Sequence, residues 1–162
     1  MREYLQFLIL TGCRRTEALN LEWPDIDWRA GTFTLRDTKN RKPVTLPLPL
    51  HIKPLLRARR EQKGRVFPFA EPRPAINAVR KASGQMFRLH DLRRTFVSAA
   101  NSLDISAYTV KALVNHTLNA SDVTAGYDVP DMARLKKASA RIEDEILRLA
   151  GERTADVVVL RA

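Results

Sequence analysis

The sequence is poor in cysteine and has no long apolar stretch. Its single cysteine, Cys13, rules out an internal disulfide framework and a cysteine-rich zinc cluster. No apolar run approaches the roughly 18 residues of a membrane-spanning helix. Polar residues interrupt the apolar start MREYLQFLIL at helical intervals, and no small-residue cleavage site follows it. We therefore expect a protein of a reducing compartment, the cytoplasm, with no membrane partner.

Negative charge is also scarce relative to positive charge. Lys and Arg number 28 against 18 Asp and Glu, which gives a formal charge of +10. An excess of this size favours a polyanionic partner, and nucleic acid is the first candidate. A length of 162 residues with 44% hydrophobic side chains suits one domain. We expect a single domain over 1–162, with its core in 1–150 and a tail over 151–162.

Hydrophobic periodicity predicts a mainly helical chain. An N-terminal helix ends at Thr11-Gly12, and a short helical turn follows it. Further helices are expected over 50–62, 75–83, 90–103 and 106–115. A last long helix begins after Pro130 with Asp131 as its N-cap. Its apolar stripe comprises Met132, Leu135, Ile142, Ile146 and Leu149.

Two short β-prone runs, TFTL and PVTLPL, flank the segment RDTKNRK. They predict a small antiparallel sheet with Lys39 near a hairpin turn. The tail ends in the run DVVVL, which needs a sheet edge on which to dock, in its own chain or in a neighbour. The prediction is an α+β fold in which helices predominate.

Several side chains suited to phosphate chemistry stand at element boundaries. They are Arg14 near a helix start, Lys39 in the hairpin, His90 and Arg93 one turn apart, His116 at a helix end, and Tyr127 beyond it. Two guanidiniums and two imidazoles that converge on one point would stabilise a phosphate in its transition state. A lysine can protonate a departing alkoxide, and a tyrosine hydroxyl can attack phosphorus.

Each of these residues also has an ordinary interpretation. Lys42 lies on the same predicted hairpin as Lys39, so either lysine suits the role of proton donor. Arg15 and Arg94 adjoin Arg14 and Arg93, but neighbouring helical residues point about 100 degrees apart, and we expect Arg94 to point outward. His51 is expected to be a surface residue at a helix start. Cys13 is expected to be a small buried apolar residue.

Three motifs in order resemble those of the tyrosine recombinases, the phage-type integrases. TGCRRTEALNLEWPDID is similar to the first arginine box, HDLRRTF to the His-x-x-Arg box, and LVNHTLNASDVTAGY to the last box. The resemblance covers residues 10–127 and points to the prophage or genomic-island branch. It implies the DNA breaking-rejoining enzyme fold, with a three-stranded antiparallel sheet beside a helical core. Asn115 departs from the pattern, because many relatives have glycine before the histidine.

The resemblance implies a role for each site residue. Arg14 and Arg93 would hold the scissile phosphate, and Tyr127 would attack it. Lys39 would protonate the leaving 5′-oxygen. His90 and His116 would hydrogen-bond or assist proton transfer, and Glu17 would support the cluster. The product would be a 3′-phosphotyrosine and a free 5′-hydroxyl, formed without ATP, metal or any other cofactor.

The resemblance also implies partners. These are double-stranded DNA attachment sites, three further copies of the chain in a tetramer on DNA, a directionality factor and host architectural proteins. A monomer is expected in isolation, and the DNA-clamping domain that precedes such catalytic domains is absent from these 162 residues. Two alternatives stay open: a type IB topoisomerase-like activity, and an inactive DNA-binding remnant. The target DNA sequence and the balance of integration and excision are not encoded in any single motif.

Overall fold

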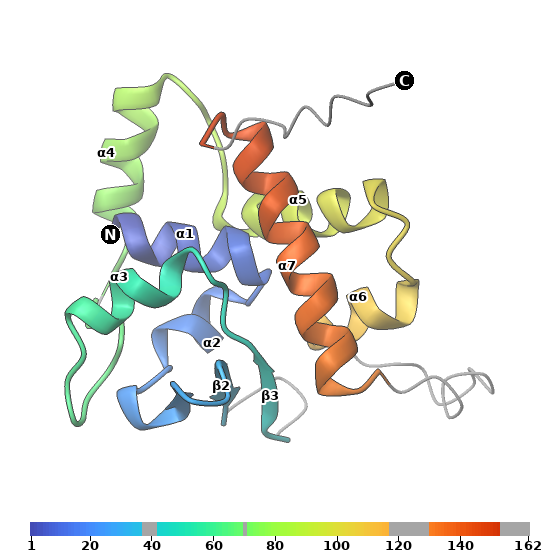
Figure 1. Cartoon of the computed structure of the whole chain (residues 1–162). Helices are drawn as coiled ribbons and strands as arrows, with labels where there is room; N and C mark the ends of the chain where they lie inside the picture. The colour runs from blue at the N-terminus through green and yellow to red at the C-terminus, as the bar shows by residue number, and fades with distance from the viewer. Residues whose placement is uncertain (37–41, 70, 117–129, 153–162) are drawn as a thin grey trace, which may run out of the picture.

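The computed structural model describes residues 1–36, 42–69, 71–116 and 130–152. Within them the fold is α+β and mainly helical, as predicted (Figure 1). The helices are α1 (Arg2–Thr11), α2 (Arg15–Leu19), α3 (Ile52–Ala58), α4 (Arg73–Ser83), α5 (Leu89–Ser102), α6 (Ala107–Leu113) and α7 (Met132–Leu149), with a 3-10 turn, η1, at Trp23–Asp25.

A small antiparallel sheet follows α2. Its strands are β1 (Ile26–Asp27), β2 (Thr32–Leu35) and β3 (Val44–Pro47), in the spatial order β1-β2-β3. Phe33 pairs with Ile26 on one side and with Leu46 on the other. These three side chains are buried and join the sheet to the core. The strand pair β2 and β3 was predicted from the sequence pattern, and the third strand was implied by the family resemblance without a position.

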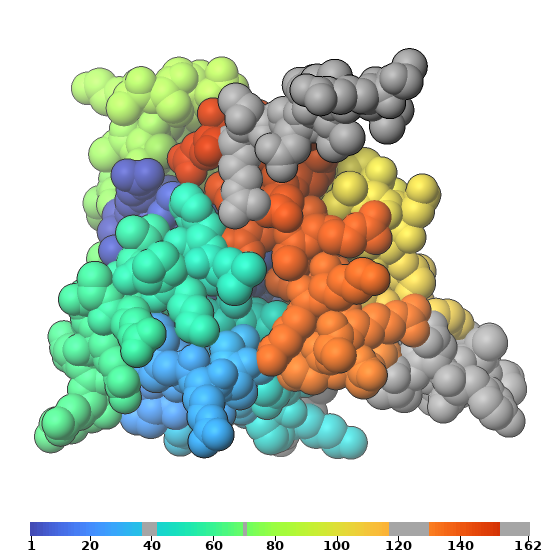
Figure 2. Space-filling view, viewed as in Figure 1, coloured from blue at the N-terminus to red at the C-terminus, as the bar shows by residue number. Residues whose placement is uncertain are grey.

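Helices from both ends of the chain share the helical core. α1 packs against α5 and α7, so the first helix and the last described one lie side by side. α7 crosses the front of the molecule in Figure 1, with α5 behind it. Figure 2 shows its side chains filling the face between α3 on one side and α5 and α6 on the other. Leu135, Ile142 and Ile146 are buried along α7, as the apolar stripe predicted.

Local chemistry explains where α1 and α7 end or begin. Gly12 ends α1 in the left-handed region at φ 64°, which glycine adopts at little cost. Asp131 is the N-cap of α7, and its side chain accepts a hydrogen bond from the Arg134 backbone N–H at 2.7 Å. Both boundaries agree with the prediction.

Two parts of the helical prediction were wrong. The helix expected over 50–62 is shorter, Ile52–Ala58, and Leu50 precedes it with 63% of its surface exposed. Leu149, the last residue of the predicted α7 stripe, is 62% exposed because the helix ends there, beyond the core. Within the described ranges no helix is both long and apolar enough to span a bilayer.

Candidate active site

Arg14 lies at the N-terminus of α2, where Glu17 fixes its position. The Glu17 side chain is 3% exposed. Its Oε2 accepts a hydrogen bond from the Arg14 backbone N–H at 2.9 Å, and its Oε1 accepts one from Arg14 Nη1 at 2.8 Å. One buried carboxylate thus holds both the backbone and the guanidinium of Arg14. The neighbouring Arg15 is exposed.

Arg93 is the buried arginine of the site. Its residue is 8% exposed, and its Nη1 donates a hydrogen bond to the Gly12 carbonyl at 2.8 Å. That bond connects α5 to the end of α1. Burial lowers the pKa of Arg93 from its usual range, and the positive charge of Arg14 lowers it further. The two arginines therefore lie close enough to repel each other.

His90 and Arg94, the other two basic residues of the HDLRRTF segment, have different surroundings from Arg93. His90 lies in the first turn of the same helix, three residues before Arg93, and is exposed. The Arg94 side chain is 72% exposed and donates to Asp91 at 3.4 Å. The outward position predicted for Arg94 is only partly right, because Arg94 also lines the cavity described below.

Asn115 and His116 follow α6 and close the site from a third direction. Asn115 has φ 46°, a left-handed value that asparagine tolerates better than most residues. Its carbonyl accepts a hydrogen bond from Arg14 Nη1 at 3.2 Å, and its side-chain amide Nδ2 donates to Glu17 Oε1 at 3.4 Å. The departure from glycine thus keeps the backbone conformation that glycine would adopt, and adds a polar group.

These elements surround one open cavity of about 660 Å³. It is lined by α2, α5 and the end of α6, and among its residues are four of the predicted site residues: Arg14, His90, Arg93 and His116. Lys39 and Tyr127 lie outside the described residues. The alternative lysine, Lys42, is exposed and does not line this cavity.

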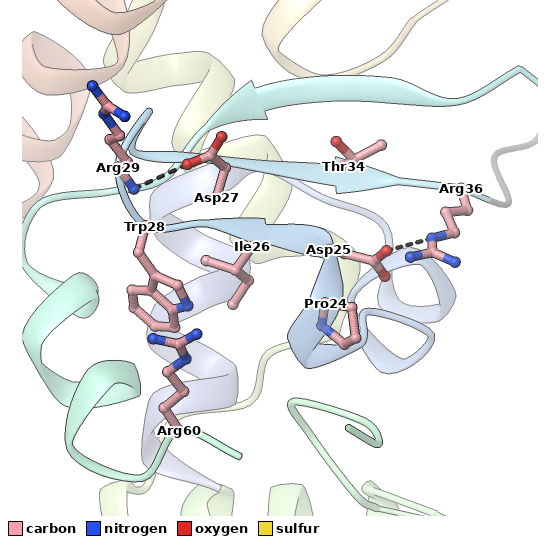
Figure 3. Close-up of a pocket in the computed structure, with 9 residues that line it drawn as sticks. All are labelled: Pro24, Asp25, Ile26, Asp27, Trp28, Arg29, Thr34, Arg36 and Arg60. Carbon is pink, nitrogen blue, oxygen red and sulfur yellow. Dashed lines mark hydrogen bonds and ion pairs between the residues drawn. The ribbon is translucent and has the colours of Figure 1, made fainter. Parts of the chain in front are cut away.

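A second cavity, of about 650 Å³, lies beside β1 and β2 (Figure 3). Several of its polar groups have partners within the fold. Asp25 pairs with Arg36, and Asp27 accepts the backbone N–H of Arg29 at 2.9 Å. Arg60 lies over the Trp28 ring at 5.6 Å from its centre. Because these pairs satisfy one another, we place the candidate site in the first cavity.

The predicted site residues that line this cavity carry guanidinium or imidazole groups. Among the residues that the structure describes, no three His, Cys, Asp or Glu side chains gather as a metal site would require. Within the described chain, the Glu17 carboxylate contacts Arg14, and the Asp91 carboxylate contacts the more exposed Arg94. The arrangement is suited to bind an anion that carries more than one oxygen.

The chain matches the phage integrase family over residues 1–128 and belongs to that family. It is 29% identical to the prophage integrase IntF of Escherichia coli (strain K12) over 163 aligned residues. The alignment covers 91% of this chain and 34% of that protein, so the chain spans about a third of the length of its curated relative. The resemblance seen in the sequence motifs is thus confirmed.

Two residues of the site had not been given a role from the sequence. Gly12 was predicted only as a helix end, although its carbonyl binds Arg93. Asn115 was noted only as a departure from the motif, although it contacts both Arg14 and Glu17. A usable signal existed for Asn115, because asparagine and glycine share a tolerance for left-handed backbone. Nothing in the sequence marks the Gly12 carbonyl as an acceptor.

Proposed function

We propose that this chain carries the catalytic site of a site-specific DNA recombinase that cuts and rejoins DNA through a covalent 3′-phosphotyrosine. The observation that supports this proposal best is the cavity in which Arg14, Arg93, His90 and His116 meet. Residues from three separate segments of the chain converge there. Membership of the phage integrase family makes a DNA phosphodiester the natural substrate.

The electrostatics of the two arginines favour a bound phosphate. Arg14 lowers the pKa of Arg93, which means that each cation destabilises the other. Glu17 offsets part of this repulsion from beside Arg14. An anion between the guanidiniums would offset the rest, and its stabilisation would grow as negative charge develops on the phosphate oxygens. The free site is therefore preorganised for the charge of the transition state.

The proposed reaction is a transesterification in two steps. The Tyr127 hydroxyl attacks phosphorus and forms the phosphotyrosine bond, while the bond from phosphorus to the 5′-oxygen breaks. His90 or His116 assists removal of the phenolic proton, and Lys39 supplies a proton to the leaving 5′-oxygen. A 5′-hydroxyl from a second strand then attacks the phosphotyrosine and releases the tyrosine. One phosphodiester is exchanged for another, so no external energy source is needed.

The experiment is covalent trapping on DNA. Duplexes of randomised sequence, nicked so that a short cleaved strand diffuses away, are incubated with the protein and separated under denaturing conditions. We expect a protein-DNA adduct whose DNA identifies the preferred site. The adduct should be lost in Tyr127→Phe. Absence of an adduct with the wild type would overturn the proposal, and an adduct with Tyr127→Phe would overturn the choice of nucleophile.

The proposed partners follow from the same reaction. Strand exchange needs two DNA duplexes and a protein copy at each of the four cleaved strands, which is the basis for proposing a tetramer on DNA. Relaxation of supercoiled plasmid without strand exchange would instead favour the topoisomerase-like alternative. The proposed location is the cytoplasm, on DNA.

A further inference from the structure

Asn115 occupies a backbone position where glycine would serve equally well. Its φ of 46° is left-handed, and only one other described residue that is not glycine, Asp104 at φ 53°, has a positive φ. Glycine adopts this conformation with less strain. Asparagine is favoured over glycine at such a position only if its side chain makes an interaction that offsets the backbone strain.

The Asn115 amide makes its contact with the carboxylate that holds Arg14. Glu17 Oε1 lies 2.8 Å from Arg14 Nη1 and 3.4 Å from Asn115 Nδ2. Arg14 Nη1 also donates to the Asn115 carbonyl at 3.2 Å. The three residues form a closed ring of hydrogen bonds, in which the Asn115 side chain is the one member that glycine cannot replace.

We propose that Asn115 is a positioning residue that orients Arg14 through Glu17. The inference rests on the proposed function, because Arg14 is placed there on the scissile phosphate. The amide restrains the Glu17 carboxylate, and the carboxylate restrains the guanidinium. The ring also ties the turn that carries His116 to α2, so that residues from two sides of the cavity keep one relative placement.

The geometry indicates which step depends on Asn115. Asn115 is not among the described residues that line the cavity, and the printed contact of its amide is with Glu17. Because the amide is neutral, its loss leaves the net charge of the DNA-facing side chains unchanged. A displaced guanidinium, by contrast, stabilises the transition state less well, because small misplacements of catalytic groups slow reactions strongly. The rate of cleavage at saturating DNA should fall, and the affinity for DNA should stay the same.

The first experiment compares Asn115→Gly with Asp104→Gly in the intact protein. Both substitutions put glycine at a left-handed position, but Asp104 does not line the candidate site. Single-turnover cleavage is measured on the trapped DNA sequence, together with DNA affinity. We expect Asn115→Gly to cleave about 5- to 20-fold more slowly with unchanged affinity, and Asp104→Gly to match the wild type. Equal rates for Asn115→Gly and wild type, or a loss confined to affinity, would overturn the inference.

A like-charge substitution tests the same contact. Asn115→Asp places a second carboxylate against Glu17, and like charges at this distance repel each other. We expect it to cleave more slowly than Asn115→Gly. A rate for Asn115→Asp equal to or above that of Asn115→Gly would contradict the proposed ring.

The inference can also be tested without DNA cleavage. NMR relaxation of the Arg14 side-chain nitrogens reports directly how firmly the guanidinium is held in the free protein. We expect greater mobility in Asn115→Gly and no change in Asp104→Gly. If the wild type forms no adduct, the proposed function is wrong, and this measurement still decides the positioning role: unchanged Arg14 mobility in Asn115→Gly would refute it.

Discussion

At the scale of single residues, Gly12 contributes both to the packing of the core and to the candidate site. It has φ 64°, and a Cβ added there would lie 2.8 Å from Phe96 Cδ1. Its carbonyl also receives the hydrogen bond from Arg93. We expect Gly12→Ala to lower the free energy of unfolding by about 2 to 4 kcal/mol, because left-handed strain and overpacking add together. Thermal or urea unfolding measures this loss.

Gly84 provides the matched control for Gly12. It ends α4 at φ 68°, but an added Cβ would meet nothing within 4 Å. Gly84→Ala should therefore cost only the left-handed strain, about 1 kcal/mol. If both variants lost the same stability, the close approach to Phe96 would not be a constraint on Gly12.

Cys13 should make the protein sensitive to alkali. Burial raises the pKa of its thiol from 9.0 to about 12. The folded state thus favours the neutral thiol, and this contribution to stability is complete below pH 9 and is lost between pH 9 and 12. We expect the free energy of unfolding to fall by up to roughly 1.4 kcal/mol per pH unit there. The fall should be shallower in Cys13→Ala, and equal slopes would disprove the assignment.

The positions of single residues were predicted correctly where their side-chain chemistry is distinctive. Arg14, His90, Arg93 and His116 were predicted and line one cavity. Cys13 was expected to be buried, and it is. His51 was expected at the surface, but it is half-buried between Gln6, 3.4 Å away, and Glu152, 3.6 Å away. Contacts between residues so distant in sequence leave no local pattern, which is why that prediction was incomplete.

At the scale of elements, Glu143 connects the last described helix to α3. This α7 carboxylate is 2% exposed. It accepts the backbone N–H of Leu50 at 2.9 Å and also that of His51, just before α3 begins. A buried anion that receives two backbone hydrogen bonds at a helix start has a favourable environment. Glu143 therefore holds together two elements that are about ninety residues apart in sequence.

We expect Glu143→Gln to cost about 1 to 3 kcal/mol of unfolding free energy. An amide accepts through one oxygen only, so one of the two backbone N–H groups loses its partner. Glu145→Gln is the control on the same helix, because Glu145 pairs with the exposed Arg148 of the next turn at 2.7 Å. This substitution should leave the free energy of unfolding almost unchanged, because surface ion pairs contribute little. Chemical unfolding of both variants measures these losses of stability. Equal losses would contradict the role assigned to Glu143.

Helix positions were easier to predict than helix partners. Apolar periodicity indicated α1, α5 and α7, and the Asp131 cap marked where α7 begins. The family resemblance implied a third strand, but no sequence pattern located β1, because two residues give too short a pattern and their pairing with β2 depends on tertiary contacts. The Glu143 contact was missed for a related reason, since a glutamate on a charged helix looks like a solvated residue.

At the scale of the whole molecule, positive charge is distributed unevenly. The segment from Arg73 to Arg88 contains four basic residues and no acidic one. It includes α4, whose one buried residue is Ile76, and it runs directly into α5, which carries His90 and Arg93. α4 stands at the edge of the molecule in Figure 1. A stretch with an excess of positive charge thus directly precedes the helix that carries two of the predicted site residues, although Arg73 itself pairs with Glu71 at 3.8 Å.

We expect DNA binding by this chain to weaken steeply with salt, and α4 to contribute to that dependence. Each phosphate contact releases condensed counterions, so the logarithm of the binding constant falls linearly with the logarithm of the salt concentration. Arg73 and Lys81 are exposed on α4. Replacing both with alanine should reduce the slope by about 2 if both contact phosphates. Fluorescence anisotropy with one duplex at several salt concentrations measures the slope.

The control for this experiment removes the same charge elsewhere. Lys136 and Lys137 are exposed on α7 and do not line the cavity of Arg14 and Arg93. Replacing them lowers the net charge of +10 by the same two units. If net charge alone governed binding, both double variants would weaken it equally. A larger change in slope for the α4 variant means that DNA lies along α4 and enters the cavity from that side, whereas equal slopes would rule out this orientation.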